Sequence, residues 1–543
     1  MSETLVESAQ DIDPGIAQLS IRRRYWLLAV ACMDVSIVIA SMVALNAALP
    51  DIARQTAATQ AQLTWVIDGY TLVLACLLLP AGAIGDRYGR RGALLVGLAV
   101  FILASAAPMV FDTPVQLIVA RAVAGAGAAF IMPATLSLLT AAFPKSERNK
   151  AVGIWAGVVG SGAVFGFLIT GGLLHFWPWQ SIFVAFAVAG VGLFVLTCTV
   201  PSSRDEHATP LDWIGAILIG AAVAVFVLGV VEAPVRGWTH PVVWGCMAGG
   251  VALGVAFAVL QLKRRHPLLD IRLFRKPEFA TGAVGVTFLF FANFGYFFVS
   301  MQYIQLVMGY SPIQTAFALC PLILPVLVLG ATTHWYLPRL GLRLCVSLGL
   351  LVIAGGLMCM RLLEVDSGYL EYAWPLLIMS TGMGLCTAPT TSAIMGAVPD
   401  EKQGVASAVN DTTREVGAAL GIAVAGSILA AHYQNHLGPK LSGLPAEVRE
   451  PILGSLAEAL AVTGQLGPQG TAVAELAKQA FLDATNSALL VMAVVLGAAA
   501  VFVGIWAPGR DGRQLRMVRR LRSRGTPLPD DRSWQWSRAG RGW

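Results

Sequence analysis

Between two long apolar segments of the chain lies the run Gly82-Ala83-Ile84-Gly85-Asp86-Arg87-Tyr88-Gly89-Arg90-Arg91. Its glycines permit a tight reversal of the backbone, because glycine adopts positive φ angles at little cost. Asp86 and the arginines carry opposite charges and can form ion pairs at a helix junction. We expect these pairs to hold neighbouring helices together in one conformation. The sequence therefore predicts a conformational loop at residues 82–91.

The rest of the chain is strongly apolar. Of its 543 residues, 56% are hydrophobic and 13% are charged, whereas soluble domains carry about 25% charged residues. Apolar stretches of roughly 18 to 25 residues are long enough to cross a bilayer. They recur at 25–49, 62–83, 92–111, 114–140, 151–176, 180–200, 211–231, 241–262, 279–302, 313–337, 342–363, 371–397, 403–431 and 484–507. We expect an all-α integral membrane protein with 14 transmembrane helices.

The distribution of basic residues predicts the orientation in the membrane. An even number of spans puts both termini on one side, and most of the 37 lysines and arginines fall in the segments on that side. The positive-inside rule then places both termini in the cytoplasm. The tail at 509–543 carries ten arginines against three aspartates, which favours contact with anionic lipids over nucleic acid. Thirty arginines against seven lysines are typical of a GC-rich bacterial genome, and we expect a bacterial inner (cytoplasmic) membrane.

Several motifs resemble those of one family. The run at 82–91 resembles the signature loop of the major facilitator superfamily, and the fourth span, with Arg121 followed by Gly125 and Gly127, is similar to the family's span-four motif. Residues 407–421 and 266–275 look like the fourteen-span drug:proton antiporters. Residues 65–72 and 155–166 look most like the quaternary-ammonium efflux pumps (QacA-like, with the related EmrB-like pumps).

The resemblance implies a major facilitator fold, in which two six-helix bundles enclose a cavity that opens alternately to each side. Two inserted helices connect the bundles. The expected division of the chain is a cytoplasmic tail at 1–24, an N-terminal bundle at 25–200, two inserted helices at 201–265, a C-terminal bundle at 266–508 with an outer loop at 432–483, and a basic tail at 509–543. Residues 339–343, Arg-Leu-Gly-Leu-Arg, lie where a second copy of the signature loop would fall.

The chain departs from the family pattern at two places. The family has an aspartate seven residues before its Ala-Leu-Pro, but here Ser41 holds that position ahead of Ala48-Leu49-Pro50. Asp34 lies seven residues earlier still, two turns away and within about 20° of the same helix face, and is a candidate for a displaced proton site. The span-five motif of the family reads Gly-Pro-x-x-Gly-Gly, but here Phe167 replaces the proline and Thr170 replaces one glycine. The residues assigned to this motif are Gly162, Gly166 and Gly171.

Charged side chains inside spans are expensive, at roughly 3 kcal/mol each, so each needs a partner or a function. In the first half we assign proton coupling to Asp34, Asp68 and Arg121, with Arg121 approaching an acid when substrate binds. A structural ion pair is the alternative for each of these residues. Carriers of protons need carboxylates that bind and release a proton within the membrane.

In the second half, Asp411 and Glu415 share one helix face, and Arg414 can neutralise Asp411 locally. Either the three residues form an intrahelical salt bridge, or the carboxylates face the cavity and receive a cationic substrate. Aromatic rings attract cations as well. The ninth span supplies many of them, of which we nominate Phe291, Phe294 and Tyr296 as substrate contacts.

The leading hypothesis is a proton-coupled exporter of hydrophobic, cationic small molecules. The alternative is a dedicated exporter of an endogenous secondary metabolite or cell-envelope lipid. The sequence contains no Gly-x-x-x-x-Gly-Lys-Ser/Thr loop, no His-Glu-x-x-His and no Gly-x-Ser-x-Gly, so we expect neither ATP drive nor an enzyme. We expect no cofactor and no metal, with the proton gradient as energy source. The predicted partners are small-molecule substrates, protons and the lipid bilayer, and the protein is expected to be a monomer.

Overall fold

The computed structural model describes residues 19–45, 48–56, 58, 60–110, 113–203, 211–399, 402–441, 445–465, 470–510 and 512–515. Helices make up almost all of this part of the chain, as the sequence predicts. In the first half the helices are α2 (Ile21–Ala44), α3 (Leu49–Thr56), α4 (Gln60–Tyr88), α5 (Arg90–Ala106), η2 (Ala107–Met109), α6 (Pro114–Ala142), α7 (Lys145–Phe176) and α8 (Gln180–Cys198).

The remaining helices follow in the same order. They are α9 (Trp213–Arg236), α10 (Pro241–Lys263), η3 (Ile271–Arg275), α11 (Pro277–Gln302), η4 (Tyr303–Val307), α12 (Pro312–Ala318), η5 (Cys320–Leu322), α13 (Ile323–Met360), α14 (Tyr369–Gly396), α15 (Gln403–Leu437), η7 (Gly438–Leu441), α16 (Ala446–Gly454), α17 (Leu456–Gln465) and α18 (Thr471–Trp506).

Twelve described segments are long and apolar enough to cross a membrane, against the 14 spans that the sequence predicts. The difference lies in the C-terminal half. One candidate of 48 residues, Ile313–Met360, covers two predicted spans, and α14 is not among the twelve. Inside that candidate Gly341 has a φ of 76° and interrupts the helical backbone of α13.

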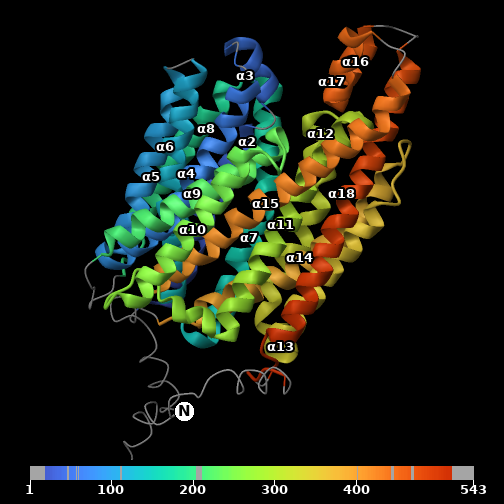
Figure 1. Ribbon diagram of the computed structural model, residues 1–543. Coiled ribbons are helices and arrows are strands. Elements are labelled where there is room, and N and C mark those ends of the chain that lie inside the picture. Colours follow the sequence, from blue (N-terminus) through green and yellow to red (C-terminus); the bar gives the residue numbers. More distant parts are fainter. Residues whose placement is uncertain are drawn as a thin grey trace, which may run out of the picture.

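Two helical bundles lie side by side in Figure 1, α2 to α8 in blue to teal and α11 to α18 in yellow-green to red. The helices α4 and α6 of the first bundle pack against α15 of the second, and α7 packs against α13 and α14. We call this contact surface the seam. Backbone polar groups are satisfied within each helix, which is the condition for exposing a helical surface to lipid.

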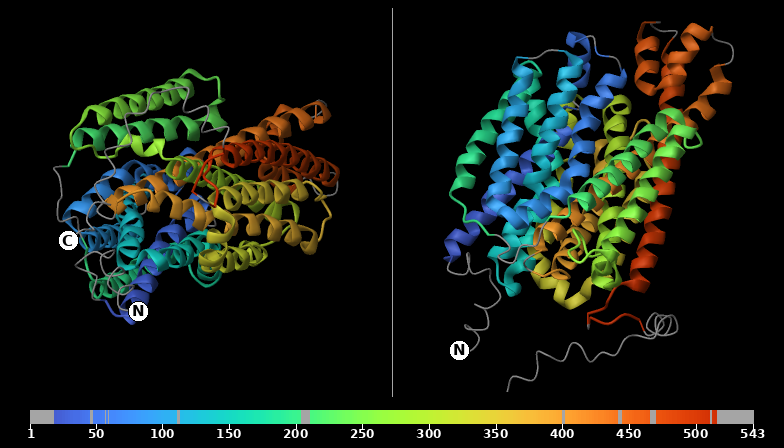
Figure 2. Two further views of the ribbon diagram at one scale, coloured as in Figure 1. Left: turned by 90° about the horizontal axis from the view of Figure 1, so that it is seen from below. Right: turned by 60° about the vertical axis from the view of Figure 1, so that its left-hand side comes forward.

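The pair α9 and α10 lies outside both bundles, at one side of the molecule (Figure 2). The α9 helix packs against α4 of the first bundle and α15 of the second, so the pair covers one edge of the seam. Asp212 caps α9 by accepting a hydrogen bond of 3.0 Å from the Gly215 N–H. Its other oxygen accepts a hydrogen bond of 2.7 Å from Gln261 at the end of α10, which ties the two helices together.

The segment predicted as a loop at 432–483 is mostly helical. The α15 helix continues to Leu437, and α18 begins as early as Thr471. Between them lie η7, α16 and α17, beside the upper end of α18 in Figure 1. Residues 446–461 lie in α16 and α17, whereas residues 471–481 form the first part of α18. Tyr433 fixes α16 by donating a 3.0 Å hydrogen bond to the Ile452 carbonyl.

Candidate functional site

The signature loop joins the two bundles through Asp86. Its two carboxylate oxygens accept hydrogen bonds from the first turn of α15, one of 2.9 Å from the Gly404 N–H and one of 3.1 Å from the Val405 N–H. A helix N-terminus carries unpaired N–H groups and a positive dipole end, which a carboxylate satisfies. Arg90 forms an ion pair of 2.9 Å with Asp86 on the other side. The predicted charged latch is therefore present, and its second partner is a helix terminus.

Two glycines let the latch close. A Cβ atom on Gly82 would lie 2.5 Å from the Gly404 carbonyl oxygen, so α4 and α15 approach here more closely than any side chain permits. Gly89 has a φ of 112°, which other residues rarely adopt, and it makes the turn between α4 and α5. Gly85 packs more loosely, with the Ala93 side chain 3.4 Å from the position of its absent Cβ.

The arginines of the loop also bind the segment that follows α8. Arg90 donates through its backbone N–H to the Ser203 carbonyl at 2.9 Å and through its side chain to the Ser203 hydroxyl at 3.1 Å. Arg91 donates to the Val200 carbonyl at 3.0 Å. Arg87 lies over the ring of Tyr88 at 5.4 Å. The loop thus fastens the chain where it leaves the first bundle.

Arg121 is buried in the first bundle, with 2% of its surface exposed. It donates hydrogen bonds to the Ser41 hydroxyl at 2.8 Å, the Ser41 carbonyl at 3.0 Å and the Val66 carbonyl at 3.2 Å. Its guanidinium carbon lies 4.2 Å from the centre of the Tyr70 ring. Ser41, which holds the position of the family's aspartate, is therefore in direct contact with Arg121.

Asp34 does not join this group. It is fully buried and accepts a hydrogen bond of 3.1 Å from the Thr197 hydroxyl of α8, and its other oxygen has no hydrogen-bond partner. Asp34 and Ser41 lie on similar faces of α2, but packed helices cross at an angle. Ser41 therefore faces α6, whereas Asp34, two turns away on the same face of α2, faces α8. The structure does not bring Asp34 to the partners of Arg121.

Asp68 lies at the edge of the first bundle that faces the inserted helices. It is partly buried on α4, which packs against α9, the helix that carries Glu232. Glu232 is paired with Arg236 at 2.5 Å. The sequence did not indicate Glu232, because a carboxylate near a helix end reads as an interfacial residue.

The second bundle presents a buried charged face on α15. Arg414 pairs with one Asp411 oxygen at 3.2 Å, and Asn410 donates to the same oxygen at 3.1 Å. The other Asp411 oxygen and the Arg414 Nε have no hydrogen-bond partner. Asp411 is fully buried and Glu415 is 7% exposed. The predicted local pair between Asp411 and Arg414 is confirmed, and Glu415 lies one turn further along the same face.

Two aromatic rings cover the Arg414 guanidinium. Its carbon lies 4.5 Å from the centre of the Phe290 ring on α11 and 5.9 Å from that of Trp155 on α7. Trp155 belongs to the first bundle, so the charged face of α15 meets that bundle at the seam. The indole N–H of Trp155 donates a hydrogen bond of 3.3 Å to the Thr135 hydroxyl of α6.

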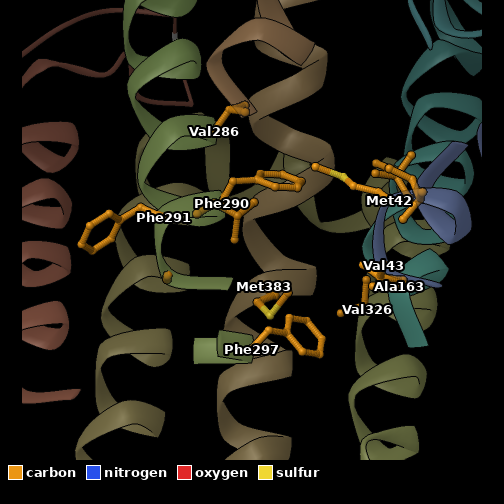
Figure 3. Close-up of a cluster of buried hydrophobic side chains, with 14 of the residues drawn as sticks. Met42, Val43, Ala163, Val286, Phe290, Phe291, Phe297, Val326 and Met383 are labelled. Carbon is orange, nitrogen blue, oxygen red and sulfur yellow. The ribbon is translucent and has the colours of Figure 1, made fainter. Parts of the chain in front are cut away.

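The nominated aromatic residues divide between the seam and the bundle interior. Figure 3 shows Phe290 and Phe297 pointing toward the side where Met42 lies, whereas Phe291 points the opposite way. Phe294 stacks on Phe290 with ring centres 6.1 Å apart.

Tyr296 also turns away from the seam. Its hydroxyl forms a 2.5 Å hydrogen bond with the Tyr372 hydroxyl of α14, inside the second bundle. The sequence pattern therefore did not identify Phe290, and the structure does not bring the nominated Phe291 and Tyr296 to the seam. Residues 290, 294 and 297 recur at helical spacing, and this spacing was the signal in the sequence for the face of α11 that points toward the seam.

The span-five glycines pack α7 against its neighbours. A Cβ atom on Gly162 would lie 2.9 Å from Ile39 of α2, and one on Gly166 would lie 2.8 Å from Ala40 of the same helix. Both contacts are within the first bundle. Gly171 instead lies against Ile313 of α12, at 3.3 Å, across the seam.

Two helical bundles that meet along a seam with buried charges define a multi-pass membrane protein of the transporter class. The chain belongs to the Major Facilitator Superfamily, whose family model matches residues 28–422. This confirms the resemblance that the sequence motifs show. The family and the neighbours in fold are transporters, not enzymes.

Several bacterial resistance, efflux and export proteins are relatives of this chain. The chain is 33% identical to the multidrug resistance protein Stp of Mycobacterium tuberculosis (strain CDC 1551 / Oshkosh) over 473 residues, which cover 85% of this chain and 87% of Stp. It is 31% identical to the tetracenomycin C resistance and export protein of Streptomyces glaucescens over 501 residues (89% and 91%). It is 32% identical to the methyl viologen resistance protein SmvA of Salmonella typhimurium (strain 14028s / SGSC 2262) over 488 residues (87% and 97%).

Solved structures share the fold. A bacterial homolog to the human lysosomal transporter Spinster, in an inward-facing and unoccupied conformation, superposes with a TM-score of 0.56 at 15% identity, covering 90% of this chain and 98% of that one. The human organic anion transporter MFSD10 (TETRAN) gives a TM-score of 0.56 at 12% identity (87% and 99%).

Proposed function

We propose that the protein is a proton-coupled antiporter that exports hydrophobic, cationic small molecules by alternating access and so gives multidrug resistance. The observation that carries this proposal is the charged face of α15, where Asp411, Arg414 and Glu415 are buried at the seam. Charges buried in a membrane protein mark transport pathways more often than they stabilise the fold. The resistance, efflux and export functions in the names of the relatives support the same class of activity.

The surroundings of Arg414 support a cationic substrate. Phe290 and Trp155 already place their rings around a guanidinium group, which is the arrangement that binds an organic cation through its charge. Asp411 has a second oxygen without a partner, and the Glu415 side chain has no hydrogen bond or ion pair within the described residues. A cation entering the seam would meet these two carboxylates, with Phe294 beside Phe290.

Proton coupling is assigned to the first bundle. Asp34 and Asp68 are carboxylates inside spans, and in the described part of the chain neither pairs with a cation. Such groups bind a proton from one side and release it when the surroundings change. Arg121 is bonded to the helix that carries Asp68, since it donates a hydrogen bond to the Val66 carbonyl of α4. No cofactor enters this cycle, because the proton gradient supplies the energy.

The topology completes the proposal. The break at Gly341 divides the long Ile313–Met360 segment into two spans, and α14 has 28 residues, enough to cross a bilayer. We propose that these spans, together with the other eleven candidates, make up the 14 spans of the drug:proton antiporters, with both termini in the cytoplasm. We propose that the protein works as a monomer. The basic tail that would contact anionic lipids lies mostly outside the described residues.

The dedicated exporter of a secondary metabolite or cell-envelope lipid stays as the alternative. It uses the same fold, and the tetracenomycin exporter among the relatives favours it. The two hypotheses differ in the range of molecules that the protein moves.

Ethidium efflux from cells that express the protein tests the proposal, with and without a protonophore. We expect extrusion that stops with the protonophore and in the Asp68→Asn and Asp411→Asn variants. Glu475→Gln is the matched control, because Glu475 is 61% exposed and pairs only with Lys478 at the surface. Absence of dye movement at verified expression would leave the dedicated exporter as the better hypothesis.

A further inference from the structure

Arg121 is a buried cation of the first bundle. Within the described part of the chain no Asp or Glu oxygen lies at ion-pair distance from it. Its hydrogen bonds all go to neutral oxygens, those of Ser41 and Val66. The ring of Tyr70 attracts the charge but does not neutralise it. A buried charge of this kind is costly unless another charged group meets it.

The guanidinium also has unused donors. It carries five N–H groups, and three of them are accounted for by Nε, one Nη1 and one Nη2 hydrogen bond. One N–H therefore remains on each terminal nitrogen. Terminal guanidinium N–H groups match the two oxygens of a carboxylate, which makes arginine the preferred residue for binding that group.

The opposite bundle presents the complementary charge. Tyr70 of α4 covers Arg121 of α6, and both helices pack against α15, which carries the buried Glu415. The seam thus has a positive group in the first bundle and a carboxylate in the second.

We propose that Arg121 binds the carboxylate of an amphoteric substrate, a hydrophobic molecule that carries both an anionic and a cationic group. The cationic part is held by Glu415 and Asp411, as in the proposed function, on which this inference rests. A carboxylate at position 41 would occupy Arg121 permanently. Ser41 leaves Arg121 available, so the substrate supplies the missing negative charge when it enters the seam.

Two dyes with the same ring system test the inference. Tetramethylrhodamine carries a free carboxylate beside its cationic rings, and its methyl ester is a pure cation. We would measure binding of both dyes to the full-length protein in lipid nanodiscs by fluorescence anisotropy. In the Ser41→Asp variant the new carboxylate stands next to Arg121, where the hydroxyl oxygen lies 2.8 Å from Nη1. It should weaken binding of the acid by at least about tenfold and leave ester binding within about twofold.

Two further variants complete the test. Ser41→Ala removes the hydroxyl without adding charge and should preserve acid binding, whereas Arg121→Gln should lose it as Ser41→Asp does. Ser41→Asp keeps the arginine, so it remains informative if Arg121→Gln does not fold. Equal loss of acid and ester in Ser41→Asp, or binding of the ester alone by the unmodified protein, would overturn the inference and leave the proposed function standing. Failure of both dyes to bind would contradict both.

Discussion

Asp86 accepts a hydrogen bond of 2.9 Å from the backbone N–H of Gly404, a residue 318 positions further along the chain. A side chain of the first bundle therefore caps the first turn of a helix in the second. Capping usually occurs within one helix and contributes about 0.5–2 kcal/mol. Here the same interaction holds two bundles together at one end of the seam, so its free energy contributes to the balance between conformations.

We predict that Asp86→Asn opens this end of the seam. Asparagine has one acceptor oxygen and no charge, so it cannot satisfy both N–H groups of α15 or pair with Arg90. A loss of about 1–2 kcal/mol would lower the ratio of molecules closed at this end of the seam to molecules open there by about 5- to 30-fold. Spin labels can be attached at Tyr88 and Lys276, which are both exposed. Electron-spin measurements should then show an added population with a longer distance between the two labels. An unchanged distance distribution would show that the cap does not control this equilibrium.

We predict that Gly82→Ala separates α4 from α15. The added methyl group would lie 2.5 Å from the Gly404 carbonyl oxygen, and backbone atoms cannot move aside as a side chain would. Overpacking of this kind costs about 1–3 kcal/mol, and dye efflux should fall accordingly. Gly92→Ala is the matched control, because nothing lies within 4 Å of its Cβ position. Equal activity of the two variants would contradict the importance of the close approach.

We predict that Arg414→Gln is strongly destabilising and that adding Asp411→Asn restores much of the loss. Removal of Arg414 alone leaves the Asp411 carboxylate uncompensated, at about 3–5 kcal/mol, whereas the double variant removes that charge as well. Thermal unfolding of the purified single and double variants measures the coupling. The exposed pair Lys478 and Glu475 serves as control and should show less than about 1 kcal/mol. Additive losses in the buried pair would refute the prediction.

We predict that Trp238→Phe loosens the inserted helices. The indole N–H of Trp238, just after α9, donates to the Ser427 hydroxyl of α15 at 2.8 Å. Its loss should cost about 1 kcal/mol and raise amide hydrogen exchange in residues 232–240. Trp244→Phe is the control, since that ring is 65% exposed. Identical exchange in the two variants would mean that the bond does not anchor the pair.

Local pattern accounts for what the sequence predicted well. The long apolar stretches predicted helices, and the mixed charges at 82–91 predicted a local ion pair. Helix formation and the Asp86–Arg90 pair both depend on residues close together in the chain. The pair between Asp411 and Arg414 was predictable for the same reason, since three residues separate its members on one helix. The contacts of Arg121, Asp34 and Phe291 were not predictable, because each depends on which distant helix packs against its own.

The sequence by itself determined that the chain is a helical membrane protein, which family it belongs to and which few ionisable residues stand within its spans. Composition, periodicity and spacing are local properties, and the cost of burying a charge in lipid depends on residue type. Only the tertiary structure decided that Asp86 caps α15, that Ser41 is the partner of Arg121, and that Phe290 is the ring over Arg414. These pairings depend on how helices cross and on where glycines allow close approach, and both are fixed when the bundles pack.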